Sequence, residues 1–120
     1  MTMQECYKAI GADYDDVLGR LRSERLIQKF VLKFLDDGSY ELLCSSMDAG
    51  DLETAFRASH TIKGVCANLG FTDLGRSSHD LTEALRSRDG AQAAALFPQV
   101  KTDYDRTVRA IRAFKAEAGL

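Results

Sequence analysis

The residues best suited to chemistry in this 120-residue chain lie in one short stretch, His60-Thr61-Ile62-Lys63-Gly64. The imidazole of an exposed histidine is largely neutral at pH 7 and can act as a nucleophile. A lysine three residues later lies about one helical turn away, where its charge can hold an anionic group on the ring. Gly64 costs roughly 1 kcal/mol relative to alanine in a helix interior, but it removes a side chain that would shield the ring. The stretch indicates a site that receives a charged group from a large partner.

These residues fall on the exposed side of a helix predicted over 51–69. Asp51 is a typical N-cap, and Gly70 is a typical C-terminal stop. His60 lies roughly 140° from the centre of the inward stripe, at ~100° per residue, so it projects outward from the middle of the helix. That stripe consists of small and apolar residues: Leu52, Ala55, Ser59, Ile62, Cys66 and Leu69. An isolated surface histidine is usually incidental, but one beside a lysine and a mid-helix glycine is harder to dismiss.

The rest of the chain predicts further helices around this one. Glycine and Asx clusters divide it into helix-length pieces, and no segment alternates apolar and polar residues long enough for a strand. Short connections make consecutive helices antiparallel neighbours, so we expect an all-α fold, an antiparallel up-and-down four-helix bundle with short additional N-terminal helices. The expected bundle helices are 23–35, 51–69, 73–87 and 91–117. Pro98 predicts either a bend in the last helix, which we favour, or a helix that starts near Phe97.

Composition and charge narrow the class of protein. The 16 basic and 18 acidic residues give a net charge of −2 and are spread along the chain, whereas a nucleic-acid binder needs a clustered basic face. No apolar run approaches about 18 residues, and the first residues do not form a signal peptide. Cys6, Cys44 and Cys66 have spacings that match no zinc site, which favours free thiols in a reducing cytoplasm. We therefore expect one cytoplasmic domain over 1–120.

The sequence around the histidine resembles a known family. The motif H-T-I-K-G at 60–64, followed by A-N-L-G at 67–70, is similar to the signature of histidine-containing phosphotransfer (HPt) domains of bacterial two-component phosphorelays. The resemblance covers nearly the whole chain, from about 13 to 115, and its most specific part is 52–85. It implies a four-helix bundle with the histidine exposed on the second bundle helix.

The resemblance also implies a role for each residue of the motif. His60 would be the phospho-acceptor, Lys63 would hold the phosphoryl oxygens, and Gly64 would give a partner's active site access to the ring. Many family members carry a polar residue, often glutamine, 22 positions after the histidine, where it contacts the ring's other nitrogen; Thr82 occupies that position here. The surface expected to bind the partner is the band around the ring, with Phe56, Arg57, Ala67 and Asn68.

By resemblance, such a protein accepts a phosphoryl group from a receiver-domain aspartate and passes it to another receiver aspartate. The implied partners are receiver domains of response regulators or hybrid histidine kinases, and the implied intermediate is phosphohistidine. Mg²⁺ is expected in the partner receiver, and no cofactor, metal, nucleic acid or membrane is expected to bind this chain. We expect a monomer without ATP-dependent kinase activity, and whether a phosphotransfer intermediate counts as an enzyme is a matter of definition.

Three alternatives compete with this interpretation. The first is a non-catalytic helical interaction module whose histidine is incidental. The second is a kinase fragment that phosphorylates its own histidine, which would need the glycine-rich ATP-binding boxes that the chain lacks. The third is a metal-binding bundle, which would need paired Glu-x-x-His motifs. The second histidine, His79, has no candidate partner ligand and is expected to be an ordinary helical residue.

Overall fold

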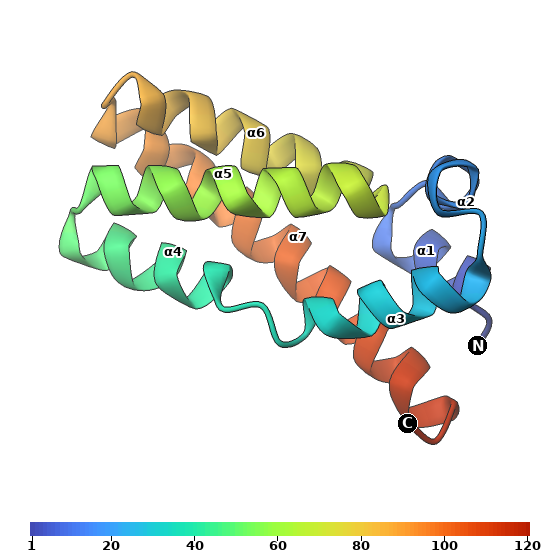
Figure 1. Ribbon diagram of the computed structural model, residues 1–120. Coiled ribbons are helices and arrows are strands. Elements are labelled where there is room, and N and C mark those ends of the chain that lie inside the picture. The colour runs from blue at the N-terminus through green and yellow to red at the C-terminus, as the bar shows by residue number, and fades with distance from the viewer.

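Seven helices and no strands form the computed structural model, which describes all 120 residues (Figure 1). The expectation of an all-α fold is therefore confirmed. None of these helices combines the length and apolarity that crossing a membrane requires. The elements are α1 (Met3–Ile10), α2 (Tyr14–Leu21), α3 (Glu24–Phe34), α4 (Ser39–Ala49), α5 (Leu52–Leu69), α6 (Thr72–Arg86) and α7 (Gly90–Glu117).

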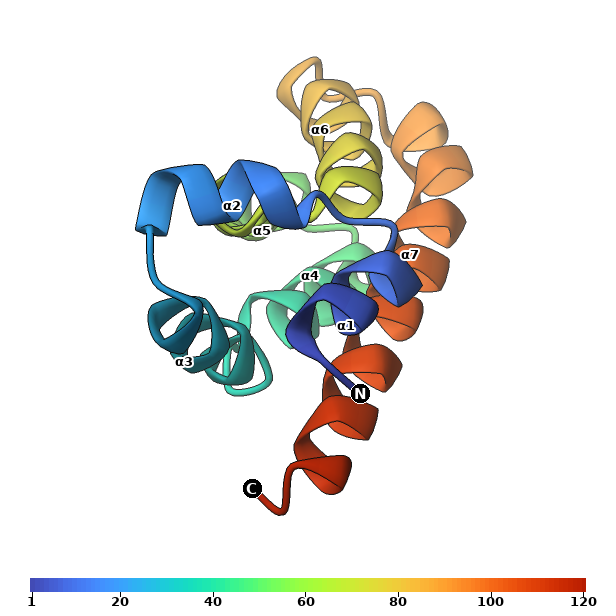
Figure 2. The ribbon, with the colours of Figure 1, turned by 90° about the vertical axis from the view of Figure 1, so that its right-hand side faces the viewer.

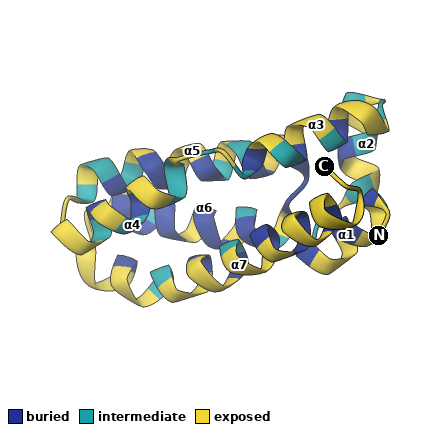
Figure 3. Cartoon of the chain, turned by 90° about the horizontal axis from the view of Figure 1, so that it is seen from below, coloured by how far each residue is buried: buried dark blue, intermediate teal, exposed yellow.

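Helices α4 to α7 form the long part of the molecule, and α1 to α3 gather at one end of it (Figures 1 and 2). Helix α5 packs against α4 and α6, and α6 packs against α7. Within this group, α5 runs antiparallel to α4, α6 to α5, and α7 to α6, with short connections between them (Figure 1). All four helices contribute buried residues to one shared core, and the buried parts of their ribbons face the space between them (Figure 3).

The assignment of one of the four expected helices to the bundle is wrong. The helix predicted at 23–35 is α3, which lies beyond the end of the bundle beside α2, and the short helix α4 packs along α5 instead (Figure 1). Helix α3 has the more regular apolar stripe, with Ile27, Val31 and Phe34 buried. Such a stripe shows which face of a helix is buried, but it does not show which helix covers that face. The two 11-residue helices could not be ranked by length.

The last helix is continuous from Gly90 to Glu117 and contains Pro98, so a helix start near Phe97 is wrong. A proline at this position has no N–H to donate to the carbonyl of Ala94 one turn earlier. Both Pro98 and Ala94 are exposed. Water can therefore replace the missing hydrogen bond, which makes the proline tolerable inside this helix.

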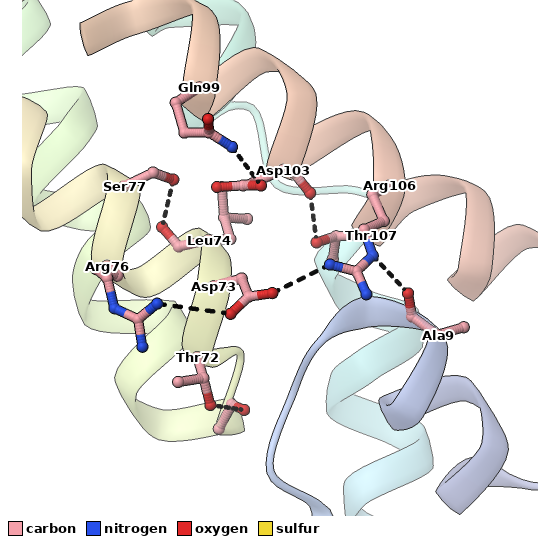
Figure 4. Close-up of polar contacts among 11 residues, drawn as sticks. Ala9, Thr72, Asp73, Leu74, Arg76, Ser77, Gln99, Asp103, Arg106 and Thr107 are labelled. Carbon is pink, nitrogen blue, oxygen red and sulfur yellow. Dashed lines mark hydrogen bonds and ion pairs between the residues drawn. The ribbon is translucent and has the colours of Figure 1, made fainter.

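Side-chain hydrogen bonds join the first helix to α5 and α7, and they join α7 in turn to α6. The hydroxyl of Tyr7, a completely buried residue of α1, donates to the carbonyl of Leu69 at the end of α5 at 2.7 Å. Arg106 of α7 donates from Nε to the carbonyl of Ala9 at 2.7 Å and from Nη1 to Oδ2 of Asp73 on α6 at 3.0 Å (Figure 4). The N-terminal segment is thus part of the core and holds the C-terminal end of α5 in place.

The three cysteines are free thiols. Burial raises the pKa of Cys6 to about 11 and that of Cys66 to about 12. Both thiols therefore stay protonated near neutral pH, where a thiol is a poor nucleophile. The two buried cysteines act as small apolar residues of the core.

Candidate functional site

Helix α5 presents His60 to solvent from its middle. The neighbouring residues Ser59 and Ile62 are buried, whereas His60 itself is exposed. Its ring is parallel to that of Phe56 one turn earlier, with an interplanar angle of 3° and 5.9 Å between the ring centroids. Neither ring nitrogen forms a hydrogen bond with another residue of the chain, since the polar side chains around it bond elsewhere. The imidazole is therefore accessible and chemically uncommitted.

Gly64 leaves the surface beside the ring bare. A Cβ atom built on this glycine would meet no other atom within 4 Å, so no neighbouring helix requires a glycine here. Its backbone is helical, without the positive φ that would call for glycine. The residue costs roughly 1 kcal/mol of helix stability, and no contact within the chain accounts for a glycine here.

Three cations belong to this part of α5 or to the α6 residues packed on it, and only one of them lacks a carboxylate partner. Arg57 forms an ion pair with Glu53 on the same helix, and Arg86 of α6 pairs with Glu83, with 3.1 Å between Nε and Oε2. Lys63 is half-buried and forms no ion pair. Its ammonium group is therefore the charge that is free to bind an incoming anion.

Thr82 does not hydrogen-bond to the ring of His60, contrary to the expectation from the resemblance. It is completely buried, and its hydroxyl donates to the carbonyl of Ser78 at 2.6 Å. The hydroxyl oxygen of Thr82 also lies 2.7 Å from the hydroxyl of Ser59, and Ser59 itself hydrogen-bonds to the carbonyl of Ser78. A threonine is too short to reach past α5 to the exposed ring, so it joins α5 to α6 instead of orienting the histidine.

One residue at the site was missed by sequence reasoning. The guanidinium carbon of Arg86 lies 4.9 Å from the centroid of the Phe56 ring, so an α6 cation supports the ring that stacks on the histidine. This contact follows from the antiparallel pairing of α5 and α6. Once Ser59 is placed opposite Thr82, a step of one turn along each helix brings Phe56 opposite Arg86.

The predicted docking band continues into a groove beside the C-terminal part of α5. Arg57, Ala67 and Asn68 are exposed, as a docking role requires. Asn68 also lines a groove of about 610 Å³, together with the exposed Phe30 of α3. The sequence did not indicate that α2 and α3 contribute to this surface. The groove is lined by Arg20, Leu21, Phe30, Lys33, Phe34, Asp36, Asp37, Val65, Asn68 and Leu69.

Comparison with protein-family models finds that residues 13–110 match the Hpt domain. The match covers well over half of the chain, so the chain belongs to the Hpt domain family, and the resemblance of its motif is confirmed. No curated protein and no solved structure matches the chain significantly. Hpt domains carry out histidine phosphotransfer in phosphorelays and interact with receiver domains.

Proposed function

We propose that this protein accepts a phosphoryl group from the aspartate of a receiver domain on His60 and passes it to the aspartate of another receiver. The observation that carries the proposal is the grouping on one exposed face of three features. These are an imidazole with no hydrogen bond, the unpaired ammonium of Lys63 and the bare backbone of Gly64. The free cysteines are compatible with a reducing cytoplasm, where the proposal places the protein.

The proposed chemistry is an in-line displacement at phosphorus. The unprotonated Nε2 of His60 attacks the phosphoryl group of the receiver's aspartyl phosphate from the side opposite the aspartyl oxygen. An N–P bond forms, the P–O bond breaks, and the aspartate leaves as a carboxylate with the electron pair. The proton on Nδ1 then passes to water, which leaves phosphohistidine with a neutral ring and an anionic phosphoryl group. Transfer to the second receiver reverses these steps.

Both proteins supply positive charge that stabilises the phosphoryl oxygens during transfer. The Mg²⁺ ion expected in the receiver would neutralise phosphoryl oxygens there. On this chain, Lys63 has no carboxylate to leave before it pairs with the same oxygens. Gly64 allows the receiver's loops to approach the ring without meeting a side chain.

The proposed docking surface runs along α5 from Arg57 to Asn68 and ends in the groove against α3. The exposed ring of Phe30 gives the groove an apolar wall, and Lys33 and Asp37 add charges of both signs. An apolar patch with a polar rim is typical of interfaces that form and dissociate readily. A phosphorelay intermediate needs that property, because it has to release one receiver before it binds the next.

The decisive experiment compares the two histidines. Each receiver domain of the source organism is loaded with ³²P from acetyl phosphate in Mg²⁺ and mixed with wild-type protein, His60→Gln or His79→Gln. His79 is also exposed and lies on α6, so it controls for any accessible imidazole. We expect acid-labile label on the wild type and His79→Gln and none on His60→Gln. Label on His60→Gln, or no transfer from any receiver, would favour the non-catalytic interaction module.

A further inference from the structure

The orientation of the His60 ring needs a physical cause. In-line attack requires the nitrogen about 3–3.5 Å from phosphorus with its lone pair along the reaction axis. Exposed side chains change rotamer within picoseconds to nanoseconds. No hydrogen bond within the chain holds the imidazole, and Thr82 is turned into the core. A contact other than a hydrogen bond must therefore bias the ring.

The only aromatic contact of the imidazole is with Phe56. The 3° angle and the 5.9 Å centroid separation describe two parallel, offset rings four residues apart on one helix. Because both side chains leave the same rigid helix, the direction of the phenyl ring decides which imidazole rotamer can stack on it. The orientation of the Phe56 ring thus determines the orientation of the His60 ring.

The orientation of the Phe56 ring is in turn fixed by helix α6. The guanidinium of Arg86 lies over the phenyl ring at 4.9 Å, and Glu83 pairs with that guanidinium. About one turn away, the hydroxyl contact of 2.7 Å between Ser59 and Thr82 joins α5 to α6. The phenyl ring therefore has a defined support on a second helix, so its rotamer does not depend on α5 alone.

We propose that Phe56 is a positioning residue that orients the imidazole of His60 for attack, and that Arg86 acts through Phe56 by fixing its ring. The inference rests on the proposed phosphotransfer. It differs from the docking role expected for Phe56, since a docking residue changes how tightly the receiver binds. A positioning residue changes how fast the bound phosphoryl group moves.

The test measures single-turnover transfer from a ³²P-loaded receiver over a range of receiver concentrations. Phe56→Leu keeps an apolar side chain without a ring, and we expect it to lower the maximal rate about threefold to tenfold at an unchanged half-saturating concentration. Phe56→Tyr restores the ring and should restore the rate. Phe97→Leu is the matched control, because Phe97 of α7 carries the same kind of cation contact, with Lys101 Nζ at 5.2 Å. A maximal rate of Phe56→Leu equal to that of the wild type would overturn the inference.

A double-mutant cycle tests the part assigned to Arg86. We expect Arg86→Gln to slow transfer about twofold to threefold in the wild type and not at all in Phe56→Leu. A loss of equal size in both backgrounds would mean that Arg86 acts independently of Phe56, which overturns its role through that ring.

The ring can also be observed without any transfer. Three-bond NMR couplings report the χ1 populations of His60 in the unphosphorylated protein, and we expect one dominant rotamer that becomes averaged in Phe56→Leu. Unchanged couplings would contradict the inference even if transfer slowed. A wild-type protein that accepts no phosphoryl group but shows the predicted couplings would contradict the proposed function and leave the positioning intact.

Discussion

The middle of α5 and its C-terminal end are built in opposite ways. In the middle, His60 has no hydrogen bond, Lys63 has no ion pair, and Gly64 has no side chain and no neighbour within 4 Å of its Cβ position. No other residue of the chain supplies the missing hydrogen bond, ion pair or neighbour. Each of these three residues is therefore available for contact with a second protein.

At the end of the helix, the carbonyls that lack intrahelical partners are satisfied by side chains from other helices. The hydroxyl of Tyr7 reaches Leu69 at 2.7 Å, and Arg20 donates to the carbonyls of Ala67 and Asn68 at 2.8 and 2.9 Å. Such carbonyls have no intrahelical donor, so external donors stabilise the helix end. The fold is thus fastened less than three turns from the histidine.

This difference separates stability from function along one helix. Satisfied polar groups stabilise the folded state, whereas groups left unpaired on the surface contribute little to it and can serve a partner. Substitutions at the end of α5 should therefore change the free energy of unfolding. Substitutions in its middle should change the transfer rate.

The largest expected effect is that of Gly70→Ala. Gly70 has a φ of 71°, and a Cβ there would lie 2.7 Å from the backbone oxygen of Asp13. The left-handed conformation and this clash together should lower the free energy of unfolding by about 2–4 kcal/mol. Urea denaturation measures this value. A change below about 0.5 kcal/mol would mean that the end of α5 tolerates rearrangement and is not the rigid anchor of the helix.

The next effect concerns transfer alone. Lys63→Met keeps most of the aliphatic stem and removes the charge, and we expect the transfer rate to fall about tenfold to thirtyfold. The free energy of unfolding should stay within about 0.5 kcal/mol of the wild type, because no ion pair is lost. Rapid-quench transfer and urea denaturation on the same preparation test both halves. An unchanged rate would remove the proposed role of Lys63.

A smaller effect on stability is expected from Tyr7→Phe, which removes only the hydroxyl. The carbonyl of Leu69 would lose its donor in a buried setting, at a cost of about 1–2 kcal/mol. Transfer to His60 should be unaffected, because the helix is anchored at the same end by Arg20 as well. Slower transfer at temperatures where the variant is fully folded would show that the two regions are coupled.

The sequence predicts the local features of α5 well, because they depend on residues close together in the chain. The cap by Asp51, the stop at Gly70 and the outward direction of His60 all follow from spacing within one helix. The motif at 60–64 also indicates the family, since its histidine, lysine and glycine lie together on the side of the helix away from the core.

Contacts between helices could not be predicted, because they depend on rotation and register. The exchange of α3 for α4 beside α5 is one example. The hydroxyl of Thr82 is another, since a single sequence does not show that Ser59 lies within 2.7 Å of it. The contact of Arg86 with Phe56 is a third, because it requires both helices to be in place.

The smallest effect gives the sharpest test, because its two readouts move in opposite directions. Gly64→Ala should raise the free energy of unfolding by about 1 kcal/mol, since alanine favours the helix and its methyl group meets no neighbour. On the proposed mechanism the same methyl group would stand where a receiver approaches, so transfer should slow about tenfold. Gly19→Ala in α2 is the matched control, because a Cβ there also meets nothing within 4 Å. It should stabilise the protein similarly without slowing transfer. If Gly64→Ala transfers as fast as the wild type, access is not the reason for a glycine at this position.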